Sequence, residues 1–333
     1  MTVYFIIDLS EETIQQFEQN SIDQNWHLFT KGRVIWTVQT YLVLKSMGLD
    51  VQLSNTLKPN AINISHAEVL SQLKPQKDCF IVSMRADKYK IPWAQLEVVQ
   101  NQNQTAKKRF YVPHWPQPGL IKRDSQRRGV KTIAFAGFVK NSALDSAQFN
   151  QKIEPHGITY TELKANQWNR YDAIDVLVAV RRFGRKHHNT KPPSKLINAW
   201  FANIPLIAGY DSAYTQIGTP GVDFIQVSNE YELVEAIITL KTNPEYYQSI
   251  VRQGQEKSKA YTRDKIGQTW HDLMTTQIIP RYKNTHANHP LIYYYHLCLY
   301  QALKWRLFIS DYINRVIKHI RRHYIPKKRN FKS

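Results

Sequence analysis

Short apolar runs alternate with longer stretches of mixed polarity along the first third of the chain. These runs lie at residues 3–8, 51–54, 61–65, 79–84 and 96–99. Runs of this length are typical of buried strands. Residues 34–47 show a helical pattern instead, which ends at Gly48. Strands separated by helical segments predict an α/β unit.

A proline-rich stretch separates this unit from a second one. Pro113, Pro116 and Pro118 exclude a strand or helix interior, so residues 111–119 are predicted to form a connecting loop. The expected strands beyond it are 131–136, 158–163, 174–180, 206–208 and 224–227, and helical patterns cover 143–153, 194–202, 231–240, 245–259 and 262–276. The run 174–180 is almost wholly apolar, as expected for a parallel sheet that is covered on both faces.

Two successive α/β units predict two doubly wound, Rossmann-like domains that face each other across a cleft. We place the domains at residues 1–120 and 121–280, with a separate tail at 281–333. The length of 333 residues fits this division, at roughly 100–200 residues per domain. A composition of 42% hydrophobic and 21% charged residues supports a core in each domain and excludes a disordered chain.

The cysteines and the N-terminus bear on the compartment. Cys79 and Cys298 are too few for a disulfide scaffold or a zinc cage, and they indicate a reducing environment. The first residues lack the basic and long apolar segments of a signal peptide. We therefore expect a cytoplasmic protein.

The positive charge is concentrated in the tail. Residues 281–333 contain twelve Lys and Arg and a single acid, Asp311, and so carry +11 of the formal net charge of +19. Wound as a helix, the tail has one aromatic and aliphatic face and one basic face. Its uncharged stretch is too short to span a bilayer, which takes about 20 residues. The tail is therefore expected to lie on the anionic inner surface of a membrane. The residues predicted to contact this surface are Trp305, Arg315, Lys318 and Arg322.

Two other interpretations of the charge stay open. The tail can be a terminal helix that packs on the body with its charged face in water. Alternatively, the tail and a second basic segment bind nucleic acid, and the protein is not an enzyme. The chain contains no recognisable helix-turn-helix, RRM or zinc motif, and an apolar helix face suits lipid better, so we expect no nucleic-acid partner.

The second basic segment follows the apolar run 174–180. Residues 181–195 hold six Lys and Arg and no acid, and they lead into a helical pattern through Pro192 and Pro193. Ligands of parallel sheets bind beyond the carboxyl ends of the strands. A helix N-terminus with nearby cations is suited to a diphosphate. The sequence therefore predicts a diphosphate site here.

The segment from Lys191 to Gly209, with its Pro-Ser-Lys run, resembles the nucleotide-sugar motif of GT-B glycosyltransferases. Residues 227–237, 111–124 and 133–137 resemble further parts of that fold, and a helix ending near Trp270 would complete the second domain. The resemblance implies a glycosyltransferase. Its second domain would bind a nucleotide-sugar donor, and its first would bind a sugar acceptor that is lipid-linked or belongs to a surface polysaccharide. It implies that Lys195 faces the donor phosphates, with Arg181 beside it.

Two departures from the family pattern bear on stereochemistry. Retaining members carry two glutamates eight residues apart, and Asn198 and Thr190 stand at those positions. An amide can still hydrogen-bond a ribose hydroxyl, but a retaining or an inverting reaction remains open. The glycine that commonly precedes the proline of the motif is replaced by Asn203 and Ile204, and Pro205 is kept.

The chain contains no Asp-x-Asp motif, which holds the metal in GT-A enzymes. We therefore expect neither a metal nor a cofactor, with cations and a helix dipole neutralising the leaving diphosphate. Adjacent His187 and His188 make a poor metal site. Gly137 is expected to let a phosphate approach the backbone. Asp211 and Ser212 would meet the sugar hydroxyls of the donor, or else form a helix N-cap.

An acceptor hydroxyl must lose its proton to a base if the reaction is inverting. Four candidates lie at the predicted strand ends and in the loop that follows, and they are Asp8, His66, Asp87 and His114. His66 and Asp87 occupy the positions that best fit a cleft, and we name them as the catalytic pair. Each can instead be a capping or loop residue. Another nucleotide-sugar enzyme, such as an epimerase, has no positive support in the sequence.

Overall fold

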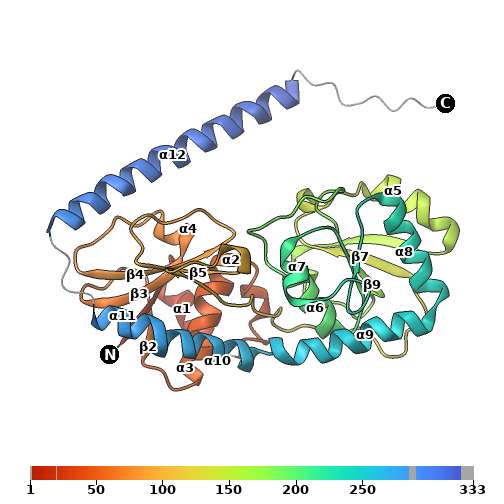
Figure 1. The fold of residues 1–333 in the computed structure, drawn as a ribbon, viewed down its shortest axis with the longest axis horizontal. Coiled ribbons are helices and arrows are strands. Elements are labelled where there is room, and N and C mark those ends of the chain that lie inside the picture. The colour runs from red at the N-terminus through yellow and green to blue at the C-terminus, as the bar shows by residue number, and fades with distance from the viewer. Residues whose placement is uncertain (1, 20, 285–289, 324–333) are drawn as a thin grey trace.

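Two parallel sheets form the body of the protein (Figure 1). The computed structural model describes residues 2–19, 21–284 and 290–323. In this part of the chain the strand order is β2-β1-β3-β4-β5-β6 in the first sheet and β11-β10-β9-β7-β8 in the second. Neighbouring strands are parallel throughout both sheets. The predicted α/β fold with two Rossmann-like units is confirmed.

The strands coincide closely with the predicted apolar runs. The first sheet consists of β1 (Val3–Ile6), β2 (Val51–Ser54), β3 (Ala61–His66), β4 (Cys79–Ala86), β5 (Leu96–Val99) and β6 (Arg109–Tyr111). The second consists of β7 (Thr132–Ala136), β8 (Thr159–Leu163), β9 (Val176–Ala179), β10 (Leu206–Ala208) and β11 (Ile225–Gln226). The edge strand β6 was not predicted, because it is short and only partly buried.

Helices cover both faces of the first sheet. A continuous helix runs through α2 (Gly32–Val34), a π-helical turn (Ile35–Gln39) and α3 (Thr40–Ser46), and it buries Trp36 against one face. The short α4 (Ala67–Leu70) packs on the opposite face. The helix α1 (Glu11–Gln19), which was not predicted, covers the outer side of the long helix through Phe17.

The second sheet is covered in the same way. On one face lie α5 (Ser146–Ile153), α8 (Glu230–Thr242) and α9 (Pro244–Ser258), and on the other lie α6 (Ser194–Ala202) and α7 (Ser212–Ile217). Helix α6 ends at Asn203, whose φ of +60° is the left-handed conformation of a helix C-cap. Asn203 thus performs the conformational role of the glycine that it replaces in the motif.

The chain returns to the first sheet after α9. Helix α10 (Arg263–Leu273), a π-helical turn (Met274–Ile278) and α11 (Ile279–Lys283) follow one another. Ile266 and Trp270 of α10 are buried in the same core as Trp36, and the indole rings of Trp36 and Trp270 meet edge to face at 6.4 Å. From its sequence we grouped this helix with the second domain. A helical pattern shows that one face is buried, but not which core buries it, so the domain boundaries themselves stay a prediction.

The last helix, α12 (Pro290–His323), docks on the first domain through only part of its length (Figure 1). Leu303 is buried against the α4 face of the first sheet, and Tyr300 meets the ring of Trp93 at 5.5 Å. Every side chain from residue 308 to residue 320 is exposed. The predicted C-terminal amphipathic helix is confirmed as an element, while the side chain of Arg322 and residue 324 onward lie outside the described residues.

Candidate active site

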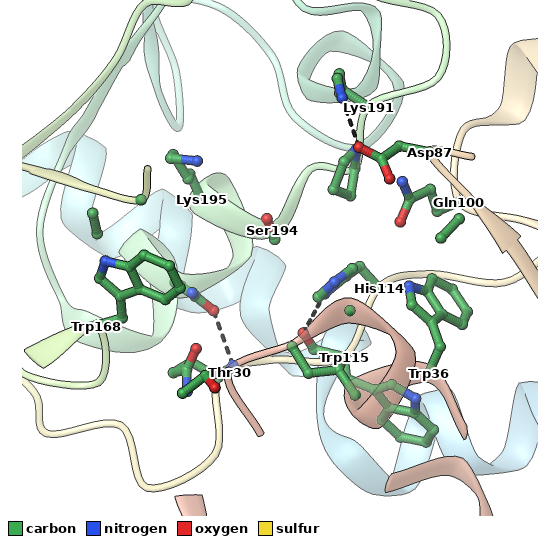
Figure 2. Close-up of a pocket in the computed structure, with 18 of the residues that line it drawn as sticks. Thr30, Trp36, Asp87, Gln100, His114, Trp115, Trp168, Lys191, Ser194 and Lys195 are labelled. Atoms are coloured by element: carbon green, nitrogen blue, oxygen red, sulfur yellow. Dashed lines mark hydrogen bonds and ion pairs between the residues drawn. The ribbon is translucent and has the colours of Figure 1, made fainter. Parts of the chain in front are cut away.

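A cleft of about 500 Å³ lies between the carboxyl ends of strands from both sheets (Figure 2). From the first domain it is lined by His66 and Asp87, at the ends of β3 and β4. From the second it is lined by Gly137, after β7, and by Arg181, after β9. Parallel strands bring their carboxyl ends to the same edge of a sheet. Residues far apart in the sequence therefore meet in this cleft.

Helix α6 points its N-terminus into the cleft. Ser194 and Lys195, in its first turn, line the wall that the second domain contributes (Figure 2). The preceding Pro193 stands at the N-cap position and makes no side-chain cap, so the first N–H groups of α6 are not satisfied by a capping side chain. Free N–H groups and the helix dipole favour an anion at this position.

The amine of Lys195 faces the cleft without an ion pair from the described residues. Among the described residues it makes no hydrogen bond or ion pair, and its nearest aromatic neighbour is the ring of Phe135, 5.2 Å away. Burial and the nearby Arg181 lower the pKa of Lys195 from its usual 10.5 to about 7. A bound anion would restore the charge of this amine.

Gly137 faces Lys195 across a narrow gap. A Cβ atom at Gly137 would lie 3.3 Å from the Nζ of Lys195, and the glycine has a φ of +154°, which other residues rarely adopt. Space and backbone conformation therefore both favour glycine here. Because Gly137 has no side chain, a phosphate has room to approach the backbone here, as predicted.

Arg181 is held by Asp211 rather than being free. The Nε of Arg181 donates to Oδ2 of Asp211 at 2.8 Å, and both side chains are largely buried. Asp211 stands at the N-cap position of α7, but its carboxylate makes no cap hydrogen bond and turns to the guanidinium. Asp211 does not line the cleft. The structure thus shows Asp211 paired with Arg181, and its expected contact with the donor sugar stays a prediction.

Ser212 also lies outside the cleft lining. Its hydroxyl accepts a hydrogen bond of 3.0 Å from the Nδ2 of Asn101, which belongs to the loop after β5 in the first domain. Ser212 therefore links the two domains, and its expected contact with the donor sugar stays a prediction.

Asp87 pairs with Lys191 across the cleft (Figure 2). The Nζ of Lys191 lies 2.6 Å from Oδ2 of Asp87. Burial raises the pKa of Asp87, but the hydrogen bond and charge of Lys191 outweigh it and hold this pKa below its usual value. The preceding Ala86 has a φ of +49°, and the pairing of β4 with β5 shifts register at this point. This strained turn aims Asp87 into the cleft.

His66 is buried and neutral at physiological pH. Its Nδ1 accepts a hydrogen bond of 3.3 Å from the backbone N–H of Glu68, so the remaining ring proton sits on Nε2. Burial lowers the pKa of His66 to about 4. His66 therefore caps α4 and offers a donor instead of a lone pair, which argues against the role of base that we expected.

Asn198 lines the cleft on the second turn of α6. Its Oδ1 accepts from the backbone N–H of Gln117 in the interdomain connection at 3.0 Å. Its predicted contact with a ribose stays a prediction. Position alone supports it, because Asn198 lies one turn after Ser194 on the same helix face.

Two groups of residues in or beside the cleft were not predicted from the sequence. Gln100 and the buried Asn101 follow β5 and hydrogen-bond to the backbone oxygens of Thr190 and Lys191, each at 3.1 Å. A polar pair directly after an apolar strand was the signal that could have revealed them. Phe138 and Trp168 meet edge to face at 5.0 Å at the cleft wall, and nothing in their sequence spacing indicated this contact.

Within the described residues, no three His, Cys, Asp or Glu side chains group together in a way that could hold a metal ion. The expected absence of a metal requirement stays a prediction.

No protein-family model matches the sequence, and no curated protein sequence matches it. Solved structures do match the fold. HepE from Anabaena, determined with UDP-glucose, gives a TM-score of 0.52 at 11% identity, covering 83% of this chain and 100% of HepE. The chain has the GT-B fold. TarM from S. aureus, determined with fondaparinux, α-GlcNAc-glycerol and UDP, gives 0.50 at 10% identity and covers 72% of this chain. The chain matches 59% of the length of TarM. At 11% and 10% identity, the similarity to HepE and TarM shows a shared fold and nothing further.

Proposed function

We propose that the protein transfers a sugar from a nucleotide-sugar donor to an acceptor hydroxyl, without a metal ion. The observation that carries this proposal is the uncompensated ammonium of Lys195 at the N-terminus of α6. A cation without a protein partner, beside free N–H groups and opposite a glycine, is suited to a diphosphate. Lys195 and Arg181 would neutralise the charge that develops on the leaving diphosphate.

UDP-sugars are the donors we propose first. HepE was determined with UDP-glucose and TarM with UDP, and the GT-B fold of this chain presents its cations on the second domain, at the carboxyl end of β9. Asn198 would hydrogen-bond the ribose.

A carbohydrate is the acceptor we propose. The first-domain side of the cleft presents polar side chains, among them Thr30, Glu68 and Asp87. Polar groups of this kind can hydrogen-bond the hydroxyls of a sugar. TarM was determined with α-GlcNAc-glycerol and fondaparinux. We propose an acceptor that is lipid-linked or part of a surface polysaccharide, because α12 would hold the protein at a membrane.

Helix α12 supports the membrane proposal through an exposed apolar stripe, which we call the outer stripe. Its exposed members are Tyr294, Tyr295, Trp305, Phe308, Ile309, Tyr312, Ile313, Val316, Ile317 and Ile320. At about 100° per residue they fall within one half of the helix, and most of them point away from the docked Leu303. Arg315 and Lys318 lie on the polar half. None of the helices described is long and apolar enough to cross a membrane. We propose peripheral binding to an anionic inner surface from the cytoplasm.

A thermal-shift experiment tests the donor proposal. UDP or UDP-glucose at 100 times its Kd should stabilise the protein by about 2.7 kcal/mol, which is a Tm increase of several degrees. The variant Lys195→Ala should lose this shift. Lys186→Ala, which removes an exposed cation from the same loop, is the matched control and should keep it. If no nucleoside diphosphate or nucleotide sugar shifts the Tm, the proposed function is wrong.

A further inference from the structure

A second histidine, His114, faces the cleft with the opposite tautomer to His66. It belongs to the connection between the two domains and lines the cleft on the first-domain side (Figure 2). Its Nδ1 lies 2.7 Å from the backbone oxygen of Trp115. A carbonyl oxygen only accepts, so Nδ1 carries the proton and the neutral ring keeps its lone pair on Nε2. The two histidines therefore present opposite hydrogen-bonding groups.

The ring of His114 is held in a fixed orientation. It meets the buried indole of Trp36 edge to face, with ring centres 5.7 Å apart and planes at 90°. Trp115, which accepts the Nδ1 hydrogen bond, is itself buried and donates from its indole Nε1 to Oγ1 of Thr40 at 3.0 Å. A histidine clamped at Nδ1 can exchange a proton only at Nε2. Among the described residues, that atom has no hydrogen-bond partner.

The charges around His114 suit a group that starts neutral and gains a proton. Burial holds the pKa of His114 below its usual 6.5, while the nearby Asp87 opposes this and the nearby Lys195 adds to it. The imidazole is therefore unprotonated at neutral pH. Asp87 would stabilise the imidazolium once it forms.

We propose that Nε2 of His114 takes the proton of the acceptor hydroxyl during sugar transfer. This rests on the proposed function. The acceptor oxygen forms a bond to the anomeric carbon as its O–H bond breaks, and the proton moves to Nε2. The bond from the anomeric carbon to the phosphate oxygen breaks, and the nucleoside diphosphate leaves with the electron pair. The diphosphate leaves toward Lys195 and Arg181, on the opposite wall of the cleft.

The other candidates fit this step less well. His66 has no lone pair at Nε2, because its Nδ1 is the acceptor of the Glu68 N–H. Asp87 has one oxygen bound to Lys191, whose hydrogen bond and charge hold the pKa of this carboxyl below its usual value and so disfavour its protonation. Asp87 is therefore a group that positions and stabilises, while His114 moves the proton.

The variant His114→Asn tests this role, because its amide can still donate to the carbonyl of Trp115 while it lacks the base. The readout is release of UDP from UDP-glucose, with water in place of the unidentified acceptor. Loss of a general base should lower kcat by about 10²–10⁴-fold, with KM changed little, and should remove the acidic limb of the pH profile. The control is His156→Asn, because His156 is exposed and does not line the cleft.

Nitrogen NMR of the histidine rings gives a second, independent readout. His114 should be protonated at Nδ1 and His66 at Nε2, and His114 should titrate below pH 6.5. A proton on Nε2 of His114 would overturn the proposal, and so would an unchanged kcat and acidic limb in His114→Asn. If UDP-glucose binds without turnover, the proposal is tested by the tautomer of His114 that NMR measures. Failure of the wild-type protein to bind UDP-glucose would instead contradict the proposed function as well.

Discussion

At the scale of single residues, Lys195 favours diphosphate binding but destabilises the folded protein. Burial and the charge of Arg181 outweigh the opposing charge of Asp211, and the pKa of the Lys195 amine falls from 10.5 to about 7. Between these two pH values the unfolded chain holds a proton that the folded chain has lost, so the stability of the protein should rise with pH over this range. Below pH 7 the full destabilisation is present. The lysine is retained, we infer, because a diphosphate needs it.

The variant Lys195→Met tests this conflict. Methionine has a similar length and no charge, so the Tm at pH 7 should rise by at least ~2 °C, and the gain should shrink toward pH 10 as the wild-type lysine no longer carries its penalty. Binding of UDP should be lost in the same variant. Differential scanning calorimetry across this pH range provides the measurement, with Lys186→Met as the exposed control. A lower Tm in Lys195→Met would show that the amine stabilises the fold.

Residue identity also explains the departures from the family motif. Asn203 takes the left-handed conformation that a glycine would take, because asparagine is the residue that best tolerates it after glycine. Asp211 looks like a helix cap in the sequence, but it bonds Arg181. In both cases the type of side chain allows only a few structural roles. The residues that surround it in space determine which of these roles it has.

At the scale of elements, α12 has two apolar faces with different partners. Leu299, Tyr300 and Leu303 pack on the first domain, while the outer stripe faces away from it. Helical periodicity predicted the stripe. The docked face was less visible, because its few members are mixed with polar residues.

Replacing two exposed stripe residues should release the protein from a membrane without unfolding it. We expect Ile309→Ser combined with Ile313→Ser to weaken binding to vesicles of phosphatidylcholine and phosphatidylserine by at least ~10-fold, because two isoleucine side chains no longer enter the interface. The Tm should stay unchanged, since both side chains are exposed. Asn314→Ser, on the polar half, is the control. Equal vesicle binding by all three proteins would remove the membrane proposal.

At the scale of the whole molecule, polar contacts hold the two domains together beside the cleft. Asn101, fully buried, donates to the backbone oxygen of Lys191 and to the hydroxyl of Ser212, and it accepts from Gln216 at 2.9 Å. The ion pair of Asp87 with Lys191 lies next to this cluster. The same loop that carries the cleft cations therefore also carries the contacts between domains.

The variant Asn101→Ala should loosen this closed arrangement. Loss of the three hydrogen bonds between the domains favours more open domain positions, so the radius of gyration from small-angle X-ray scattering should increase. The Kd for UDP should rise by about 10-fold, because only the closed fraction binds fully. Thr105→Ala, whose hydroxyl bonds only within its own loop, provides the comparison. Unchanged scattering and affinity would show that the cleft does not depend on these contacts.

The sequence by itself determined the elements and their two-unit order. Continuous apolar runs specify strands buried on both faces, and the Pro-Ser-Lys run places Lys195 in the first turn of α6. Both signals act over a few residues. The tertiary structure alone decided partners: α10 covers the first sheet, Asp211 holds Arg181, and the histidines adopt opposite tautomers. Each of these depends on a group that is distant in the sequence. A local pattern records that a side chain is buried or polar, and the fold decides what it touches.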